Sequence, residues 1–248
     1  MRAVFRLLLL SCLALPAFAA EINVFAAASL SDALKEIAQK YEPASGNKLL
    51  FNFAASSVLA RQIKEGAPAD LFFSADEAKV SDLAQADRVV SSSRRSLLGN
   101  TLVIVVPRDS TLTIAGPADL ARPGVTKLAL AEPQTVPAGI YARSYLEKLE
   151  LWPQVAAKVI PTENVRACLA AVESGNVSAG IVYKTDALIA KGARIAFEVP
   201  AEAGPRISYP VVLVKASRQP EAAADLLAYL LSPDAQVVFE KYGFIILH

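Results

Sequence analysis

Short apolar segments alternate along the chain with longer stretches in which apolar residues recur every three or four positions. The short segments predict strands at 22–26, 48–53, 70–73, 101–106, 126–130, 157–160, 179–183 and 193–198. The longer stretches predict helices at 30–41, 57–65, 76–86, 140–150, 165–174, 219–231 and 233–242. Strands that alternate with helices usually pair in parallel and are covered on both faces. The pattern therefore predicts an α/β fold with parallel-type sheets flanked by helices.

Two longer apolar strands, predicted at 100–109 and 207–216, interrupt this alternation. Loops rich in proline, glycine and charged residues flank both of them. We expect the chain to cross at these strands between two lobes, with residues 20–100 and 215–248 in the first lobe and residues 101–214 in the second. A single continuous sheet is the alternative.

Residues 1–19 have the three parts of a secretory signal peptide. They combine a positively charged start, an apolar run and a small-x-small cleavage site, formed by Arg2 and Arg6, residues 7–15 and residues 17–19. The run is too short to span a membrane as a helix. We expect an exported protein that begins near Ala20. Processing as a lipoprotein at Cys12 is an alternative, disfavoured by the bulky Leu10 before it.

Charge and residue usage exclude several classes of function. Removal of the predicted signal peptide takes away Arg2 and Arg6, so the 25 basic residues fall to 23 against 24 acidic ones, and no basic surface for nucleic acid is expected. It also removes Cys12, so Cys168 is the only cysteine left, and its apolar surroundings predict a buried structural thiol. The only histidine is His248. These absences argue against Cys/His metal sites and against Ser/His/Asp catalysis.

Small residues and hydroxyls occupy the junctions at which strands pass into helices. Four such junctions read "AAAS", "FAASS", "VPAG" and "TENV". Ser29 or Ser31 is predicted to be an N-cap, and so is Asn164. Free backbone N–H groups at helix starts bind anions without a formal positive charge, so converging junctions would form an anion site. Ordinary structural capping is the alternative, and neither common phosphate-binding glycine motif occurs.

Three carboxylates lie close together in "GAPADLFFSADEAKV", residues 66–80. Asp70, Asp76 and Glu77 raise the possibility of acid–base chemistry or of a hard cation. We expect structural roles instead, with Asp76 capping the helix that follows and Asp70 at a strand edge. Tyr183 ends a predicted strand, where its hydroxyl would either reach a ligand or be half-buried.

Eight segments in family order carry a resemblance that covers nearly all of the chain after residue 20. They are "VFAAASL", "GAPADLFFSAD", "LLGNTLVIVVP", "VPAGIYA", "NVRACLAAVESG", "GIVYKTDA", "YPVVLV" and "KYGF". Through them the chain resembles the periplasmic molybdate-binding proteins of ABC importers. The resemblance implies a two-lobed periplasmic binding protein fold (type II) with two crossover strands. It also implies no enzymatic activity, no cofactor, molybdate or tungstate as ligand, an ABC permease as partner, and a monomer.

Carried over by position, the family's ligand contacts are Ser29, Ser56, Ala138, Val165 and Tyr183. The resemblance implies that hydroxyls and backbone N–H groups hold the oxygens of molybdate and that no residue ligates the metal directly. The family often has three serines where this chain has Ala55-Ser56-Ser57, so Ser57 is an alternative to Ser56. Arg166 either assists the anion or, as we expect, pairs with an acidic residue.

Two other functions stay open at this point. The same class of carrier could bind sulfate or another small oxyanion, because sulfate likewise carries no proton at neutral pH. An exported hydrolase could use Ser57 with Lys64 as its base, although nothing in the spacing of the two residues supports it.

Overall fold

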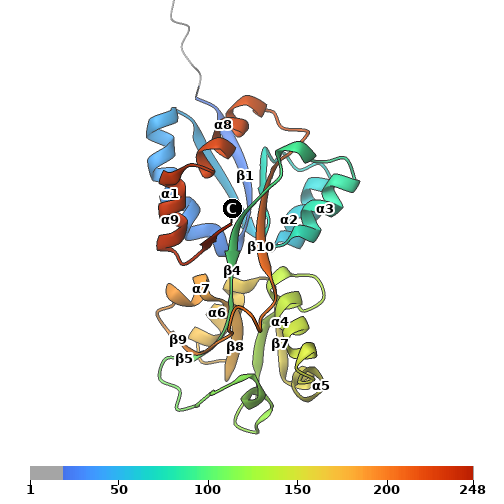
Figure 1. The fold of residues 1–248 in the computed structure, drawn as a ribbon, viewed down its shortest axis with the longest axis vertical. Coiled ribbons are helices and arrows are strands. Elements are labelled where there is room, and N and C mark those ends of the chain that lie inside the picture. The colour runs from blue at the N-terminus through green and yellow to red at the C-terminus, as the bar shows by residue number, and fades with distance from the viewer. Residues whose placement is uncertain (1–18, 248) are drawn as a thin grey trace, which may run out of the picture.

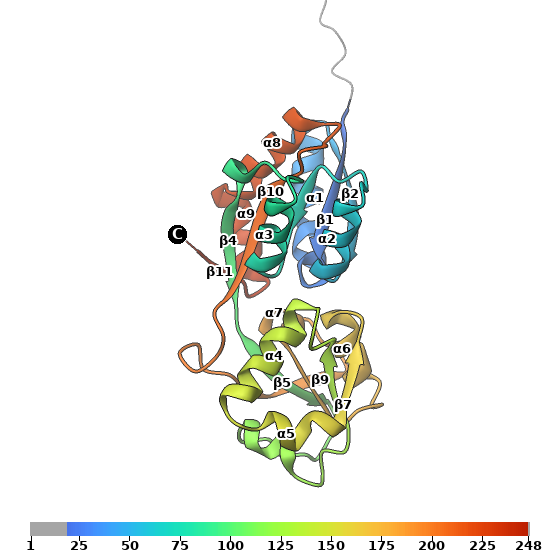
Figure 2. The same ribbon diagram turned by 90° about the vertical axis from the view of Figure 1, so that its right-hand side faces the viewer.

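The computed structural model describes residues 19–247, which form two lobes, one above the other in Figure 1. Each lobe is a β-sheet covered by helices, and extended segments connect the two lobes (Figure 2). The predicted signal peptide, apart from its last residue, lies outside the described residues. Within residues 19–247, every helix is too short or too polar to cross a membrane.

The first lobe contains a six-stranded sheet in the order β11-β4-β10-β3-β1-β2. Its strands are β1 (Glu21–Ala27), β2 (Lys48–Ala54), β3 (Leu71–Phe73), β4 (Arg95–Asn100), β10 (Ile207–Leu213) and β11 (Ile245–Ile246). Its helices are α1 (Ser31–Ser45), α2 (Ser56–Lys64), α3 (Glu77–Gln85), α8 (Pro220–Leu230) and α9 (Pro233–Lys241), with short 3₁₀ turns η1 (Ala28–Leu30) and η2 (Ser91–Ser93). Helices α2 and α3 cover one face of the sheet, and α1, α8 and α9 cover the other.

The second lobe contains a five-stranded sheet in the order β7-β6-β8-β5-β9. Its strands are β5 (Leu102–Pro107), β6 (Leu128–Ala131), β7 (Val159–Thr162), β8 (Ala179–Tyr183) and β9 (Ala193–Glu198). Its helices are α4 (Pro137–Lys148), α5 (Trp152–Val155), α6 (Val165–Glu173) and α7 (Lys184–Leu188), with 3₁₀ turns η3 (Pro117–Ala121) and η4 (Ala156–Lys158). Cys168 on α6 is fully buried, as predicted, and its thiol donates to the carbonyl oxygen of Ala129 at 3.2 Å.

The two-lobed α/β architecture is confirmed, but the sheets are mixed rather than parallel. In the first sheet β10 runs antiparallel to β3 and β4, and in the second sheet β5 runs antiparallel to β8 and β9. The strands that do pair in parallel, such as β1 with β2 and β6 with β7, are joined by helical crossovers. A strand that enters from the other lobe has no such crossover, so its direction is not tied to theirs.

The connections between the lobes differ from the prediction at one boundary. On the outward path, only Thr101 separates β4 of the first sheet from β5 of the second. On the return path, the chain leaves β9 and enters β10, which lies between β3 and β4. Residues 207–213 therefore belong to the first sheet, and placing them in the second lobe was wrong. The prediction also missed β4 as a strand separate from β5.

Candidate functional site

A small cavity lies between the two lobes, at the helix starts that follow β1, β2, β6 and β7. The space between its lining atoms, including the part that is open to solvent, is about 220 Å³. Uncharged side chains line it throughout: Ala27, Ala28, Ser29, Ala54, Ala55, Ser56, Ala75, Val136, Pro137, Ala138, Asn164, Val165 and Tyr183. The five residues predicted as ligand contacts are all in this set, so the fold brings them together from both lobes.

Most of the helix starts around the cavity have no side-chain cap. The residues before η1, α1, α2 and α4 make no capping hydrogen bond, so the first backbone N–H groups of these elements are left without one. The prediction that Ser29 or Ser31 is an N-cap was therefore wrong. The exception is α6, where Asn164 accepts from the N–H groups of Arg166 and Ala167 at 2.9 and 3.0 Å, as predicted.

The hydroxyl of Ser56 is held at the cavity wall by the backbone of the loop that follows β3. Its Oγ accepts a hydrogen bond from the N–H of Ala75 at 2.9 Å, and the side chain is almost completely buried. Because its oxygen is already an acceptor, its proton remains available to a ligand. Ser57 does not line the cavity; it lies on a separate groove beside α2 and α3.

Tyr183 supplies the one hydroxyl in the cavity that has no partner. Tyr183 is the last residue of β8, and only 1% of its surface is exposed. Its Oη has no hydrogen-bond partner among the residues that the structure describes. Burial raises the pKa of this phenol well above its ordinary value, so the group keeps its proton. A buried hydroxyl without a partner is destabilising by about 1–3 kcal/mol. An acceptor in the cavity would remove this penalty.

Arg166 pairs with acidic residues rather than lining the cavity, as expected. Its Nη2 lies 2.7 Å from Oδ2 of Asp32 on α1, and its Nε lies 2.5 Å from Oδ1 of Asp186 on α7. It therefore joins the two lobes beside the cavity. Asp186 is fully buried, and burial raises its pKa to about 6, against the opposing effect of the Arg166 guanidinium.

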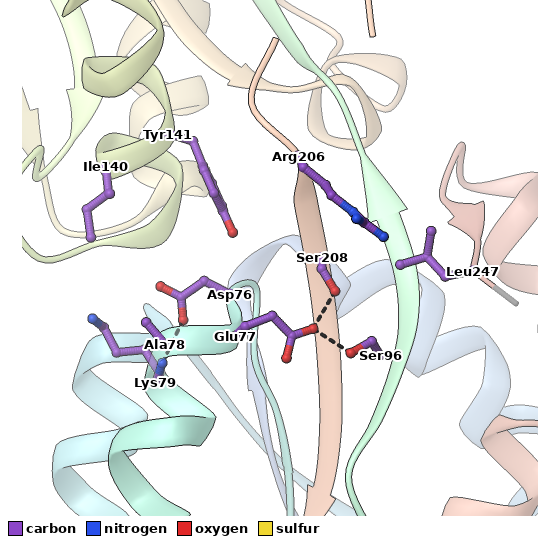
Figure 3. Close-up of a pocket in the computed structure, with 10 residues that line it drawn as sticks. All are labelled: Asp76, Glu77, Ala78, Lys79, Ser96, Ile140, Tyr141, Arg206, Ser208 and Leu247. Atoms are coloured by element: carbon purple, nitrogen blue, oxygen red, sulfur yellow. Dashed lines mark hydrogen bonds between the residues drawn. The ribbon is translucent and has the colours of Figure 1, made fainter. Parts of the chain in front are cut away.

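The acidic residues near α3 have structural roles. Figure 3 shows a larger groove, with an empty volume of about 1120 Å³, in which Tyr141 points from α4 toward the first lobe. Asp76 caps α3 by accepting from the N–H of Lys79 at 3.0 Å, as predicted. Glu77 accepts from the hydroxyls of Ser96 and Ser208, both at 2.5 Å, and pairs with Arg94.

Asp70, just before β3, also fills a structural role, because it accepts from the backbone N–H groups of Asn23 and Arg218. Within residues 19–247, no group of three or more His, Cys, Asp or Glu side chains is placed to hold a metal ion. The cavity, with its neutral donors and lack of charged lining, is the arrangement that suits a small anion.

Two residues bonded behind the cavity were missed by the sequence analysis. Tyr209 on β10 is hydrogen-bonded to Ser29, and Asn100 at the end of β4 donates to Tyr209. Ser29 and Tyr209 are 180 residues apart along the chain. No local pattern connects residues at that separation, although Asn100 and Tyr209 lie in the two predicted crossover segments.

The chain is similar to known solute-binding proteins along nearly all of its length. Residues 22–245 match the family described as bacterial extracellular solute-binding protein. The chain is 39% identical over 232 residues to the molybdate-binding protein ModA of Escherichia coli, covering 91% of this chain and 89% of that protein. It is 41% identical over 224 residues to the putative ABC transporter substrate-binding lipoprotein YvgL of Bacillus subtilis, and the match covers 90% of this chain and 85% of that protein.

Among solved structures, the chain is similar to the substrate-binding domain of a putative molybdenum ABC transporter from Clostridium difficile. The TM-score is 0.71 and the sequence identity is 35%, and the match covers 93% of this chain and all of that one.

Proposed function

Because the chain belongs to the family of bacterial extracellular solute-binding proteins, we propose that it binds molybdate or tungstate and delivers the anion to an ABC importer. Members of this family are carriers, so the protein is not an enzyme. We further propose a periplasmic protein, exported through residues 1–19, that acts as a monomer and presents its closed lobes to the membrane permease.

The observation that carries the proposal is the buried hydroxyl of Tyr183, which has no hydrogen-bond partner among residues 19–247 and lies in a cavity lined by helix starts, most of them without a side-chain cap. A tetrahedral dianion offers four oxygens that only accept hydrogen bonds. In the proposed complex they accept from the hydroxyls of Ser29, Ser56 and Tyr183 and from the backbone N–H groups of Ala138 and Val165. No residue then contacts the metal directly.

The number of donors is sufficient for tight but reversible binding. Hydrogen bonds to a charged partner contribute roughly 1.5–3 kcal/mol each, so five contacts supply about 8–15 kcal/mol before opposing terms. Ordering the lobes and desolvating the anion offset part of this sum. Binding at 1 μM corresponds to about −8 kcal/mol, so micromolar or tighter affinity is expected.

A lining of donors also selects among oxyanions. Phosphate carries a proton at neutral pH, and that proton would be left without an acceptor in the proposed site. Sulfate carries none, so the size of the cavity must exclude it, whereas tungstate is close to molybdate in size.

Calorimetric titration of the ligand-stripped protein (residues 20–248) with molybdate, tungstate, sulfate and phosphate tests the proposal. We expect sub-micromolar binding of the first two anions and no detectable binding of the others. Tight binding of sulfate would make the protein a sulfate carrier. If none of the four anions gives a binding signal, the proposed oxyanion site is refuted.

Replacing Tyr183 with phenylalanine should weaken molybdate binding by about 1–3 kcal/mol, because one donor to a charged ligand is lost. The same change should not lower the free energy of unfolding of the ligand-free protein, because the hydroxyl has no hydrogen-bond partner to lose among residues 19–247. Calorimetry and urea denaturation measure the two effects. Tyr229→Phe on α8 is the matched control, and unchanged affinity in Tyr183→Phe would place its hydroxyl outside the site.

Ser56→Ala should weaken molybdate binding by about 1–3 kcal/mol, whereas Ser57→Ala should leave it unchanged. The physical reason is that Ser56 lines the cavity and Ser57 lies on a different groove. Titration of both variants under the same conditions gives the comparison. A loss in Ser57→Ala with none in Ser56→Ala would assign the contact to Ser57.

A further inference from the structure

A chain of buried hydrogen bonds runs from the crossover strands to the cavity. The hydroxyl of Tyr209 on β10 lies 3.0 Å from Oγ of Ser29 and 3.2 Å from Nδ2 of Asn100, the last residue of β4. The same Nδ2 donates to Oγ1 of Thr185 on α7 at 2.9 Å. All four residues are buried, and they come from both lobes and from the two strands next to the crossings.

The donor and the acceptor of each hydrogen bond in this network can be assigned, starting from the amide of Asn100. Oδ1 of Asn100 accepts from the backbone N–H of Thr101 at 2.9 Å, which orients the amide so that its NH₂ group faces Tyr209. An NH₂ group only donates, so the oxygen of Tyr209 accepts from it. Among the described residues, the phenolic proton then has one acceptor within hydrogen-bond distance, Oγ of Ser29.

Ser29 is left with its own proton free. A serine hydroxyl has one proton and two lone pairs, and one lone pair is occupied by Tyr209. Its proton cannot point back at Tyr209 without leaving the phenolic proton unpaired in a buried position, which is unfavourable. Ser29 lines the cavity, so its proton is directed to whatever acceptor enters there.

The phenol is held firmly enough to fix this direction. Tyr209 is fully buried, and its ring packs edge-on against the rings of Tyr183 at 5.8 Å and Phe244 at 5.4 Å between centroids. Burial also raises the pKa of Tyr209 well above its ordinary value, so the hydroxyl remains protonated across the physiological range.

We propose that Asn100 and Tyr209 are positioning residues that make the Ser29 hydroxyl a fixed donor to the bound oxyanion. The inference rests on the proposed function and adds a basis for its selectivity. A serine free to rotate could accept a proton from a protonated oxyanion, whereas a serine held as a donor favours an anion with no proton. Because the Asn100 amide contacts both Tyr209 and Thr185, the orientation of the donor also depends on the two lobes keeping their relative position.

A double-mutant cycle tests this role by its dependence on Ser29. Tyr209→Phe keeps the ring and removes the hydroxyl, and it should weaken molybdate binding about tenfold. In a Ser29→Ala background the same change should cause no further loss, because the group that Tyr209 orients is gone. Tyr229→Phe, on the outer helix α8, is the matched control and should leave affinity unchanged. Independent, multiplying losses in the double variant would overturn the proposal, because they would indicate a structural effect of Tyr209.

A second measurement needs no ligand, and it tests the hydrogen-bond chain Asn100–Tyr209–Ser29, here called the relay, separately from the proposed function. In protein with isotope-labelled tyrosine, the Tyr209 hydroxyl proton should exchange slowly with water in the NMR spectrum. Ser29→Ala should accelerate that exchange by removing its acceptor. An exchange rate that Ser29→Ala does not change would refute the relay even if molybdate binds. If the relay is present and the wild type binds no molybdate, the proposed function alone fails.

Discussion

Replacing Arg166 with methionine should lower the free energy of unfolding by about 2–3 kcal/mol near pH 8, because it removes one partner of a buried ion pair. The variant can protonate Asp186 instead, which costs about 1.4 kcal/mol for each pH unit above its folded pKa of about 6 and so limits the loss. Asp186 is completely buried and depends on this guanidinium for its compensating charge. The loss should be read from urea denaturation, with the Arg166→Met/Asp186→Asn double variant recovering most of it. Asp32→Asn is the contrasting single variant. Its carboxylate is 39% exposed, so it should lower stability by no more than about 1 kcal/mol.

The effect of Arg166→Met should depend on pH, with a sign set by the raised pKa of Asp186. Burial lifts this pKa from 3.8 to about 6, so between these values the folded state binds more protons than the unfolded state. The contribution of Asp186 to stability therefore falls as pH rises through this window. Without the guanidinium the folded pKa rises further, and the window extends upward.

The deficit of the variant relative to the wild type should consequently be small at pH 5 and should grow to about 2–3 kcal/mol near pH 8. Urea denaturation of the wild type and of Arg166→Met at pH 5 and pH 8 measures this difference in the free energy of unfolding. An equal deficit at both would show that Arg166 stabilises the fold through packing rather than through the charge of Asp186.

Gly139→Ala should lower the free energy of unfolding by about 3 kcal/mol and should weaken the binding of molybdate as well. A Cβ on this residue of α4 would lie 2.0 Å from the carbonyl oxygen of Ala131 and 2.6 Å from that of Glu132. Both atoms belong to the backbone, so the start of α4 must move away from β6. That movement displaces the neighbouring Ala138, whose N–H is one of the proposed contacts.

Gly116→Ala is the matched control for this variant. A Cβ there meets no atom within 4 Å, and the extended backbone of Gly116, with φ −174°, accepts any residue. Its stability should stay within about 0.5 kcal/mol of the wild type, as for ordinary surface changes. Thermal unfolding and molybdate titration of both variants give the comparison. If Gly139→Ala matched Gly116→Ala in stability, the close approach of α4 to β6 would be refuted.

The positions of strands and helices could be predicted because they depend on local patterns. The predicted strand at 22–26 lies within β1, and the predicted helix at 165–174 corresponds to α6 within one residue. The capping roles of Asp76 and Asn164 were predicted correctly for the same reason, since a cap and its N–H partner are two or three residues apart. Ser29 was assigned the same role by the same rule, and there the rule failed because Ser29 lies inside the 3₁₀ turn η1, which leaves Leu30 at the N-cap position of α1.

Taken alone, the residues of this chain determined an α/β protein, without a Cys/His metal site or a Ser/His/Asp catalytic set, whose strands pass into helices through small residues and hydroxyls. Their resemblance to a family supplied the five candidate contacts. Only the tertiary structure decided that β10 lies in the first sheet, that Arg166 connects the lobes, and that Asn100 and Tyr209 stand behind Ser29. The physical reason is separation along the chain. Periodicity and capping depend on neighbours a few residues apart, whereas sheet order and buried hydrogen bonds depend on which distant segments pack together.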